Sequence, residues 1–114
     1  VEIKAKTAEA YGIKKGDYVW IETVRGRLRM RAHLHDQIHE KVVSIPHGWW
    51  LPEEPGPDRG VFEVCSNVLV DDDPDNCDVV LGSSPLKGLL CRISKAEAPA
   101  RTISQRWKEA MAAE

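Results

Sequence analysis

The chain has 114 residues, of which 42% are hydrophobic and 30% are charged, and its net charge is −2. These values predict one globular domain with its own core, since the length is too short for two. No apolar run approaches the roughly 20 residues that span a membrane, so we expect no membrane contact. The charge is uneven: residues 1–32 carry eight Lys or Arg against four acids, whereas residues 53–78 carry nine acids against one Arg.

The three cysteines, Cys65, Cys77 and Cys91, lie 12 and 14 residues apart. This spacing matches no zinc or iron–sulfur pattern. An odd number at wide spacing is more typical of buried, reduced thiols than of a disulfide framework. The sequence therefore favours a reducing, cytoplasmic location, with periplasmic export as the alternative if a twin-Arg signal lies upstream.

The first third of the chain predicts a short helix followed by a β-hairpin. Residues 7–11 form the helix, and Gly12 follows it as a left-handed C′ residue. Residues 17–23 and 27–34 both alternate between apolar and polar side chains, with Arg25-Gly26 as the turn between them. In the second strand we expect Leu28, Met30, Ala32 and Leu34 inward and Arg27, Arg29, Arg31 and His33 outward.

The rest of the chain predicts short elements separated by loops. Three prolines and two glycines in residues 51–60 exclude regular structure there. In the last helix, Ile103, Trp107, Ala110 and Met111 make one apolar stripe. The other expected elements are a strand over 41–45 ended by Pro46, a weak strand over 61–64, a short helix begun by Ser66 and Asn67, a strand over 89–93 and the helix over 102–113. Short strands with one-turn helices between them indicate a small, mainly β barrel.

No complete catalytic or metal-binding set is recognisable in the sequence. Asp71, Asp73 and Asp75 have the first spacings of a calcium loop, but the glycine and glutamate that should follow are Asn76 and Gly82, so helix capping and turn formation explain these acids better. His35 and His39 are four apart, in a segment that resembles a strand end rather than a helix.

The remaining alternative to a site for a small ligand is a site for single-stranded nucleic acid on the strand over residues 27–34, which carries the arginines. The net charge argues against it, and we expect no aromatic series on the same face as the arginines. We therefore predict no nucleic-acid partner.

Four blocks of sequence resemble one known family, in the same order and spacing. They are residues 7–27 (TAEAYGIKKGDYVWIETVRGR), 46–50 (PHGWW), 67–75 (NVLVDDDPD) and 82–93 (GSSPLKGLLCRI). Over residues 1–95 the chain is similar to the C-terminal molybdopterin-dinucleotide-binding domain of the dimethyl-sulfoxide-reductase superfamily. The resemblance implies a double-psi β-barrel over 1–95, lacking its usual first strand, and a C-terminal amphipathic helix over 96–114 that packs on the barrel or on an absent domain.

The resemblance also implies a function and a site. Such a domain caps bis(molybdopterin guanine dinucleotide) carrying Mo or W, is not catalytic by itself, and receives the metal ligand and a 4Fe-4S cluster from upstream domains of the parent oxidoreductase. The implied partners are those domains and an Fe–S electron-transfer subunit. The positions expected to face the cofactor are His47, Gly48, Trp49, Asn67, Pro85 and Lys87, with Trp50 packing instead. Asn67 offers a donor and an acceptor, Lys87 a point charge, and Gly48 close backbone approach.

The chain departs from the family pattern at several positions. Lys4-Ala5 replaces the usual Asn-Pro, so the first helix lacks its usual cap, and Val70 stands where Thr is common. Because the usual first strand is not in this sequence, we expect the chain alone to bind the cofactor weakly or not at all. The alternatives are a naturally separate small barrel subunit of such an enzyme, similar to that of formylmethanofuran dehydrogenase, and an unrelated barrel that acts as an interaction module.

Overall fold

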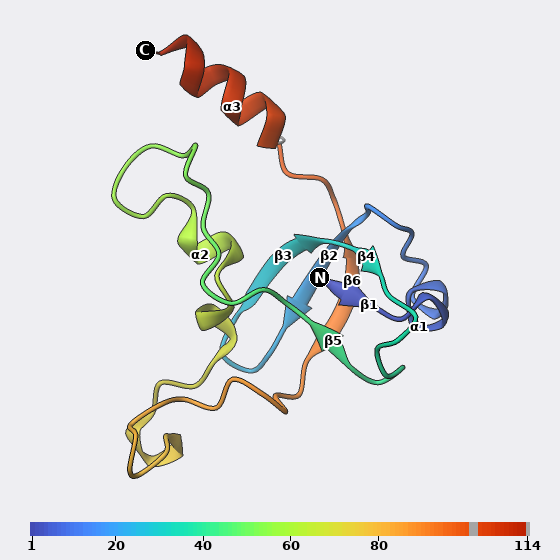
Figure 1. Ribbon diagram of the computed structural model, residues 1–114, viewed down its shortest axis with the longest axis vertical. Coiled ribbons are helices and arrows are strands. Elements are labelled where there is room, and N and C mark those ends of the chain that lie inside the picture. The colour runs from blue at the N-terminus through green and yellow to red at the C-terminus, as the bar shows by residue number, and fades with distance from the viewer. Residues whose placement is uncertain (101–102, 114) are drawn as a thin grey trace.

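Two small three-stranded sheets form the body of the protein, whose computed structural model describes residues 1–100 and 103–113 (Figure 1). One sheet has the order β4-β1-β5, from β1 (Glu2–Ile3), β4 (His33–Leu34) and β5 (Val43–Ser44). The other has the order β3-β2-β6, from β2 (Tyr18–Glu22), β3 (Arg27–Arg31) and β6 (Arg92–Ala96). The mainly β class is thus confirmed.

The predicted hairpin contributes four side chains to the core. β2 and β3 pair antiparallel with Val19 opposite Met30 and Ile21 opposite Leu28. All four of these side chains are buried, and Leu28 and Val19 are fully enclosed. The alternation of β-branched and apolar residues thus places one face of the hairpin in the core, as a period of two requires. Ile93 of β6 completes this layer opposite Ile21.

The helices are short and lie around the two sheets. They are α1 (Ala5–Ala10), α2 (Val61–Val64), the 3₁₀ turns η1 (Ser66–Leu69) and η2 (Pro74–Asn76), and α3 (Ile103–Ala112). Lys4 at the start of α1 makes no side-chain cap, as its departure from the family pattern predicted. Gly12 follows α1 with φ +65°, the left-handed conformation expected of it. No helix in the described residues is long and apolar enough to cross a membrane.

Two of the expected strands are wrong. Residues 61–64 form helix α2, because the Cys65 N–H donates to the Val61 carbonyl at 2.8 Å and β6, rather than this segment, pairs with β2. The last strand begins at Arg92 rather than at residue 89, because its pairing with β2 runs from Glu22–Arg92 to Tyr18–Ala96. Leu90, which the prediction placed in that strand, is 94% exposed.

The C-terminal helix agrees with its prediction in position, although its first expected residue, Thr102, lies outside the described residues. Arg106 is buried and pairs with Glu54 at 2.6 Å, which ties α3 to the loop over residues 51–60. Of the predicted apolar stripe, Trp107 is 53% and Met111 64% exposed. Figure 1 shows α3 standing at one end of the molecule, beyond the sheets.

Candidate functional site

The loop after β5 brings the first predicted site residues to the surface. Pro46 cannot donate to a sheet ladder, so pairing stops before it. His47 Nδ1 lies 3.3 Å from the Ser66 hydroxyl at the start of η1. Gly48 adopts φ +67°, a left-handed conformation that few other residues take without strain, and no atom lies within 4 Å of the position of a Cβ there. The backbone of this loop at Gly48 is therefore accessible to a ligand, next to η1.

The 3₁₀ turn η1 holds Asn67 next to this loop. Ser66 is buried against His47, while Asn67 is exposed, so its amide is free to face a ligand. The tip of the β2–β3 hairpin fixes η1 from the other side, because the Thr23 hydroxyl donates to the Leu69 carbonyl at 2.8 Å. His47 and Asn67 are 20 residues apart in the chain. The His47–Ser66 hydrogen bond brings their two segments together, because Ser66 and Asn67 belong to the same turn, η1.

The acidic run after η1 forms turns, as predicted. The Asp71 carboxylate accepts from the Asp73 N–H at 3.0 Å and from the Asn76 amide at 2.8 Å, and it pairs with Arg25 of the hairpin tip. The hydrogen bond from Arg25 is the largest cause that lowers the pKa of Asp71 below its ordinary value. Asp73 in turn caps η2 through the Asp75 N–H. These carboxylates are already used by the turn, which explains their spacing without a calcium ion.

Pro85 and Lys87 lie on a separate exposed segment between η2 and β6. This segment is held mainly by its own bonds, including the Asp78 N–H to the Ser83 carbonyl at 2.9 Å. Asp78 also accepts from the Val80 and Leu81 N–H groups, and these two bonds lower its pKa. The structure joins His47 to the Asn67 block, and it leaves Pro85 and Lys87 on a neighbouring arm (Figure 1).

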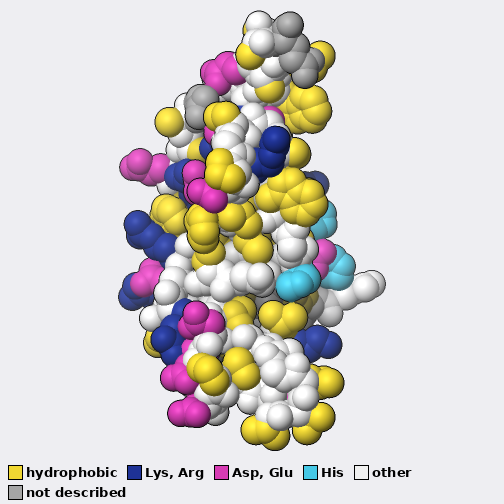
Figure 2. Space-filling view, turned by 90° about the vertical axis from the view of Figure 1, so that its left-hand side faces the viewer, with side chains coloured by type: hydrophobic (Ala, Val, Ile, Leu, Met, Phe, Trp, Pro, Cys, Tyr) yellow, Lys and Arg dark blue, Asp and Glu magenta, His cyan; other side chains and the backbone are white. Residues whose placement is uncertain are grey.

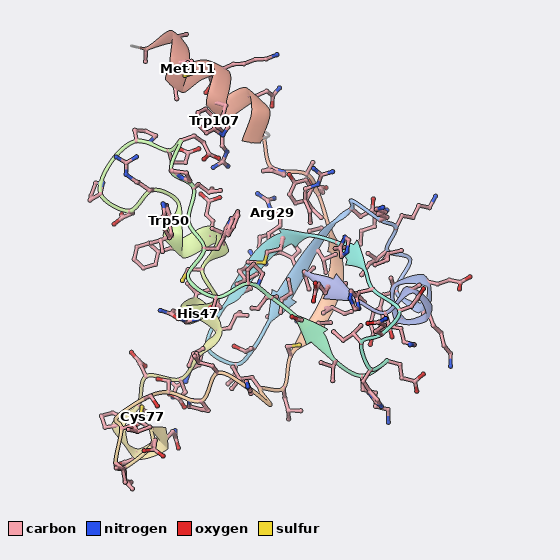
Figure 3. All side chains as sticks on the ribbon, viewed as in Figure 1. Arg29, His47, Trp50, Cys77, Trp107 and Met111 are labelled. Atoms are coloured by element: carbon pink, nitrogen blue, oxygen red, sulfur yellow. The ribbon has the colours of Figure 1, made fainter. Side chains whose placement is uncertain are left out.

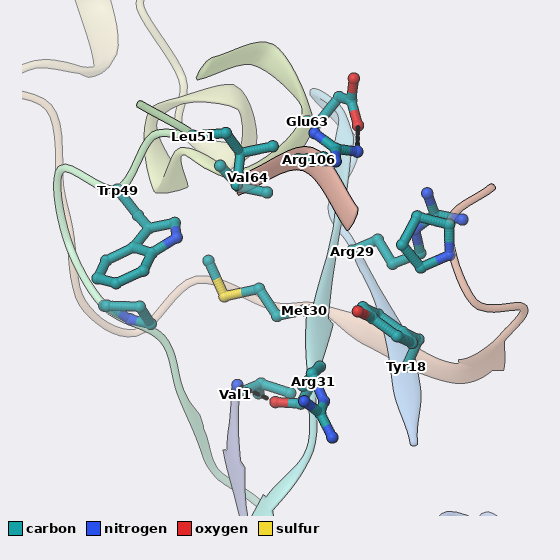
Figure 4. Close-up of a pocket in the computed structure, with 12 residues that line it drawn as sticks. Val1, Tyr18, Arg29, Met30, Arg31, Trp49, Leu51, Glu63, Val64 and Arg106 are labelled. Atoms are coloured by element: carbon teal, nitrogen blue, oxygen red, sulfur yellow. Dashed lines mark hydrogen bonds and ion pairs between the residues drawn. The ribbon is translucent and has the colours of Figure 1, made fainter. Parts of the chain in front are cut away.

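The two neighbouring tryptophans are about equally exposed, at 50% for Trp49 and 54% for Trp50. Trp50 therefore does not pack as predicted. Trp49 instead forms one wall of a cavity of about 220 Å³ at the edge of β3. In Figure 4 its ring faces Met30, with Leu51 and Val64 above them.

Several residues around this cavity escaped the sequence analysis. They are Tyr18, Arg29 and Arg31 from the hairpin, Glu63 from α2 and Arg106 from α3. Arg106 lies 2.6 Å from Glu54 and 3.9 Å from Glu63. The tail helix thus contributes Arg106 to this cavity, and nothing in the local sequence pairs Arg106 with residues some 50 positions earlier.

The expectation that no aromatic residue shares the arginine face is wrong. Tyr18 lies opposite Arg31, and Trp20 opposite Arg29, on the outer face of the hairpin. The Arg27 guanidinium lies 4.4 Å from the Trp20 ring centroid, and Arg29 lies 5.2 Å from it. The hairpin closes through a two-residue turn at Val24-Arg25, one residue earlier than the predicted Arg25-Gly26. We call Tyr18, Trp20, Arg27, Arg29 and Arg31 the arginine–aromatic face.

Comparison with known proteins decides the family. The sequence model described as "Molydopterin dinucleotide binding domain" matches residues 1–81. The chain belongs to the molydopterin dinucleotide binding domain family. A dopamine dehydroxylase of Eggerthella lenta is 39% identical over 99 residues, which are 84% of this chain and 9% of that protein. An acetylene hydratase of Syntrophotalea acetylenica is 34% identical over 87 residues, or 73% of this chain and 12% of that protein.

A solved structure agrees with this family assignment. Acetylene hydratase from Pelobacter acetylenicus superposes with a TM-score of 0.75 at 30% identity, covering 83% of this chain and 14% of that chain. The two chains thus share this mainly β arrangement over the superposed residues. The chain spans about a tenth of the length of the curated relatives that it matches.

The exposed groups fit a large polar ligand of the kind that the family name states. His47 offers an imidazole, Asn67 an amide and Lys87, on the neighbouring segment, an ammonium group, and there is open space at Gly48. Among the described residues no group of three or more His, Cys, Asp or Glu side chains could hold a metal ion. Donors and acceptors of these kinds suit the organic part of a molybdopterin-type cofactor.

Proposed function

We propose that this chain is the cofactor-binding domain of an oxidoreductase that carries bis(molybdopterin guanine dinucleotide) with Mo or W. In this proposal the domain caps the dinucleotide cofactor, and the metal ligand and a 4Fe-4S cluster come from other domains of the parent enzyme. The observation that carries it is the family match over residues 1–81, supported by relatives that are about ten times longer than the chain. The cofactor supplies the redox or Lewis-acid chemistry when bound.

The binding residues of the proposal are His47, Gly48, Trp49, Asn67, Pro85 and Lys87. His47 orients toward Ser66 and fixes the loop next to Asn67, whose amide can donate to one ligand atom and accept from another. Gly48 admits the ligand close to the backbone, and Trp49 presents half of its ring. Lys87 offers an ammonium group to the anionic part of the cofactor. Each of these residues is exposed.

The proposal extends to the fold and to the assembly. We infer a double-psi β-barrel over residues 1–95 and an α3 whose Trp107 and Met111 face another domain. The 53% and 64% exposure of these two side chains supports a covering partner for α3. The other domains and an Fe–S electron-transfer subunit are the partners that such an enzyme would need.

A separate small subunit is the second candidate, since a domain and a subunit would present the same residues. Mass spectrometry of the native polypeptide from its source distinguishes them. The domain proposal expects one chain of several hundred residues, with a cysteine cluster motif upstream of Val1. A native polypeptide whose initiator Met lies just before Val1 would contradict it and favour the subunit.

Calorimetric titration of the 114-residue chain with purified molybdopterin guanine dinucleotide tests the site. We expect weak binding, because the residues joined by the structure form only part of the proposed site. Asn67→Ala should weaken it about fivefold, the effect of one lost hydrogen bond. Lys87→Ala should weaken it about threefold, while the equally exposed, equally charged Lys15→Ala should leave it unchanged. Equal losses at Lys87 and Lys15 would show that the binding is only a general charge effect.

A further inference from the structure

The loop over residues 51–60 begins two residues after Trp49, and its two ends are joined. The Leu51 N–H donates to the Arg59 carbonyl at 2.9 Å. Leu51 is buried, and it lies so close to Gly60 that a Cβ at Gly60 would overlap its side chain. The loop therefore closes on itself at Leu51, next to the segment that carries the proposed cofactor residues.

Arg106 of α3 contacts both this loop and the helix that follows it. Its guanidinium lies 2.6 Å from the Glu54 carboxylate and 3.9 Å from that of Glu63 in α2. Glu54 is joined to the start of the loop, because its N–H donates to the Leu51 carbonyl at 3.0 Å. The Arg106 and Glu54 side chains are 10% and 14% exposed, so water screens their attraction less than that of a surface pair.

The charges of the loop and of α2 require such a cation. Residues 53–63 carry four acids against one basic residue, Arg59. Carboxylates that lie close together repel each other. The Arg106 guanidinium, placed beside both Glu54 and Glu63, offsets this repulsion. Its charge therefore favours the arrangement in which the loop and α2 lie together.

The same contacts extend to the Trp49 ring. Trp49, Leu51, Val64 and Arg106 all line the cavity of about 220 Å³. In the view of Figure 4, Leu51 and Val64 lie between the Trp49 ring and the pair that Arg106 makes with Glu63. Because one residue separates Trp49 from Leu51 in the chain, a displacement of Leu51 would move Trp49 as well.

We propose that Arg106 is a positioning residue for the proposed cofactor site. Through Glu54 it holds the loop over residues 51–60, and through this loop it holds the backbone of Gly48 and Trp49. Helix α3 is then a latch on the site, and its release lowers the affinity for the cofactor although Arg106 does not touch the cofactor. The proposal rests on the proposed function for the identity of the ligand, whereas the latch is a property of the chain itself.

NMR spectra of the 114-residue chain without ligand test the latch. Arg106→Met removes the guanidinium and keeps an apolar stem. We expect the amides of Gly48 and Trp49 to shift and to exchange faster in this variant, while the Ile21 amide of the core stays unchanged. Lys108→Met removes an equal charge from an exposed position of the same helix and should move none of them.

Two further variants address the same ion pair. Arg106→Lys keeps the charge and should leave the Gly48 and Trp49 amides near their original positions. Glu54→Gln breaks the pair from the side of the loop and should move the amides that Arg106→Met moves. If Arg106→Met does not fold by circular dichroism, Glu54→Gln takes its place.

Titration with purified molybdopterin guanine dinucleotide tests the effect on the site. Arg106→Met should weaken binding about fivefold, because the loop then occupies its binding position for a smaller fraction of the time. Trp49→Ala should weaken binding about fivefold in the unaltered chain and much less in the Arg106→Met chain, where Trp49 is already displaced. Lys87→Ala should cost about threefold in both chains, since Lys87 lies on a separate segment. A general loss of structure would reduce the effects of Trp49→Ala and Lys87→Ala alike.

Two results would overturn the proposal. The first is unmoved Gly48 and Trp49 amides in both Arg106→Met and Glu54→Gln, whether or not the cofactor binds. The second is displaced amides with unchanged affinity for the cofactor, which would remove the positioning role. Displaced amides in a chain to which the dinucleotide does not bind would instead support the latch and contradict the proposed function, so the two failures are distinguishable.

Discussion

The sheet region and the loop region of this protein differ in how they treat apolar side chains. In the β2–β3–β6 sheet, Val19, Ile21 and Leu28 are at most 1% exposed. In the loops between β5 and β6, Trp49, Trp50 and Phe62 are at least half exposed, and Val79 is 96% exposed. Figure 2 shows the hydrophobic side chains gathered on this side of the molecule, with acidic side chains among them.

The difference indicates that the sheet region has a core of its own, whereas the loop region is suited to contact with another molecule. Large contiguous apolar patches on a protein surface commonly mark binding sites. The proposed cofactor residues all belong to the loop region, and they reach the sheets through a few bonds, such as His47 to Ser66 and Thr23 to Leu69. Figure 3 shows His47 and Trp50 on the loop that runs past α2, and Cys77 on the separate segment that contains the acidic residues 71–78. In the proposed function, the sheet supports the loops, and the loops bind the cofactor.

The largest effect is expected in the sheet. Leu28→Ala should lower the free energy of unfolding by about 4 kcal/mol, because it leaves a cavity in a fully buried layer. Val79→Ala removes nearly as much side chain from a residue that is 96% exposed, and it should change stability by less than about 0.5 kcal/mol. Urea unfolding followed by circular dichroism measures both. Similar losses at the two positions would contradict the division into support and loops.

The attachment of α3 should be the next most sensitive. Arg106→Met removes the cation that pairs with the Glu54 carboxylate and should release α3 at a local cost of about 3 kcal/mol. A helix of ten residues is marginal when detached, so its amides should then exchange rapidly while those of β2 do not. Lys108→Met removes an equal charge from an exposed position of the same helix and should have no such effect. Global unfolding in the Arg106 variant would show that α3 belongs to the core.

The contact between hairpin tip and η1 joins the two regions, and Gly26 makes it possible. A Cβ at Gly26 would overlap the Val68 carbonyl oxygen. Gly26→Ala should therefore move η1 and cost about 2 kcal/mol. Gly56→Ala, at φ +87° with no atom within 4 Å, tests backbone strain alone and should cost about 1 kcal/mol. A shifted Asn67 amide resonance in the Gly26 variant but not in the Gly56 variant would report the displacement.

The smallest effect concerns pH and the ion pair from Arg25 to Asp71. Because the pKa of Asp71 is lowered in the folded state, its stabilising contribution is complete above the ordinary aspartate value of 3.8 and is lost as pH falls through the lower, folded value. Asp71→Asn should therefore reduce stability near neutral pH and flatten its loss in acid. Asp72→Asn, one residue along on an exposed position, is the control. Stability curves that stay parallel between pH 2 and 5 in all three proteins would contradict this role for the pair.

The sequence predicted the sheet region better than the loops, for physical reasons. Strict alternation over residues 27–34 has one solution when one face must be buried, whereas the turn lies at Val24-Arg25, one residue earlier than the sequence predicted. In residues 61–64 and 89–91 the apolar side chains follow neither a helical nor a strand period. Their local pattern therefore could not distinguish helix, strand and loop. The cavity beside Trp49 was beyond prediction because Arg106, Glu63 and Met30 meet only through the tertiary fold.

The candidate site was predictable only from the four sequence blocks that resemble the family. Those blocks pointed to His47, Asn67 and Lys87, but they could not show how far apart these residues lie. The His47–Ser66 bond supplies the link between the first two, and no local pattern could have predicted it. The arginine–aromatic face could have been predicted, because the hairpin register alone places Trp20 opposite Arg29.

The most direct test of the central claim is a map of where the cofactor touches the chain. In a titration of the ¹⁵N-labelled 114-residue chain with molybdopterin guanine dinucleotide, we expect shifts at His47, Gly48, Trp49, Asn67 and Lys87. The amides of Leu28 and Ile21 should stay unmoved. Shifts confined to the β3 edge, or spread equally over the exposed lysines, would contradict the assignment of the cofactor to the loop region.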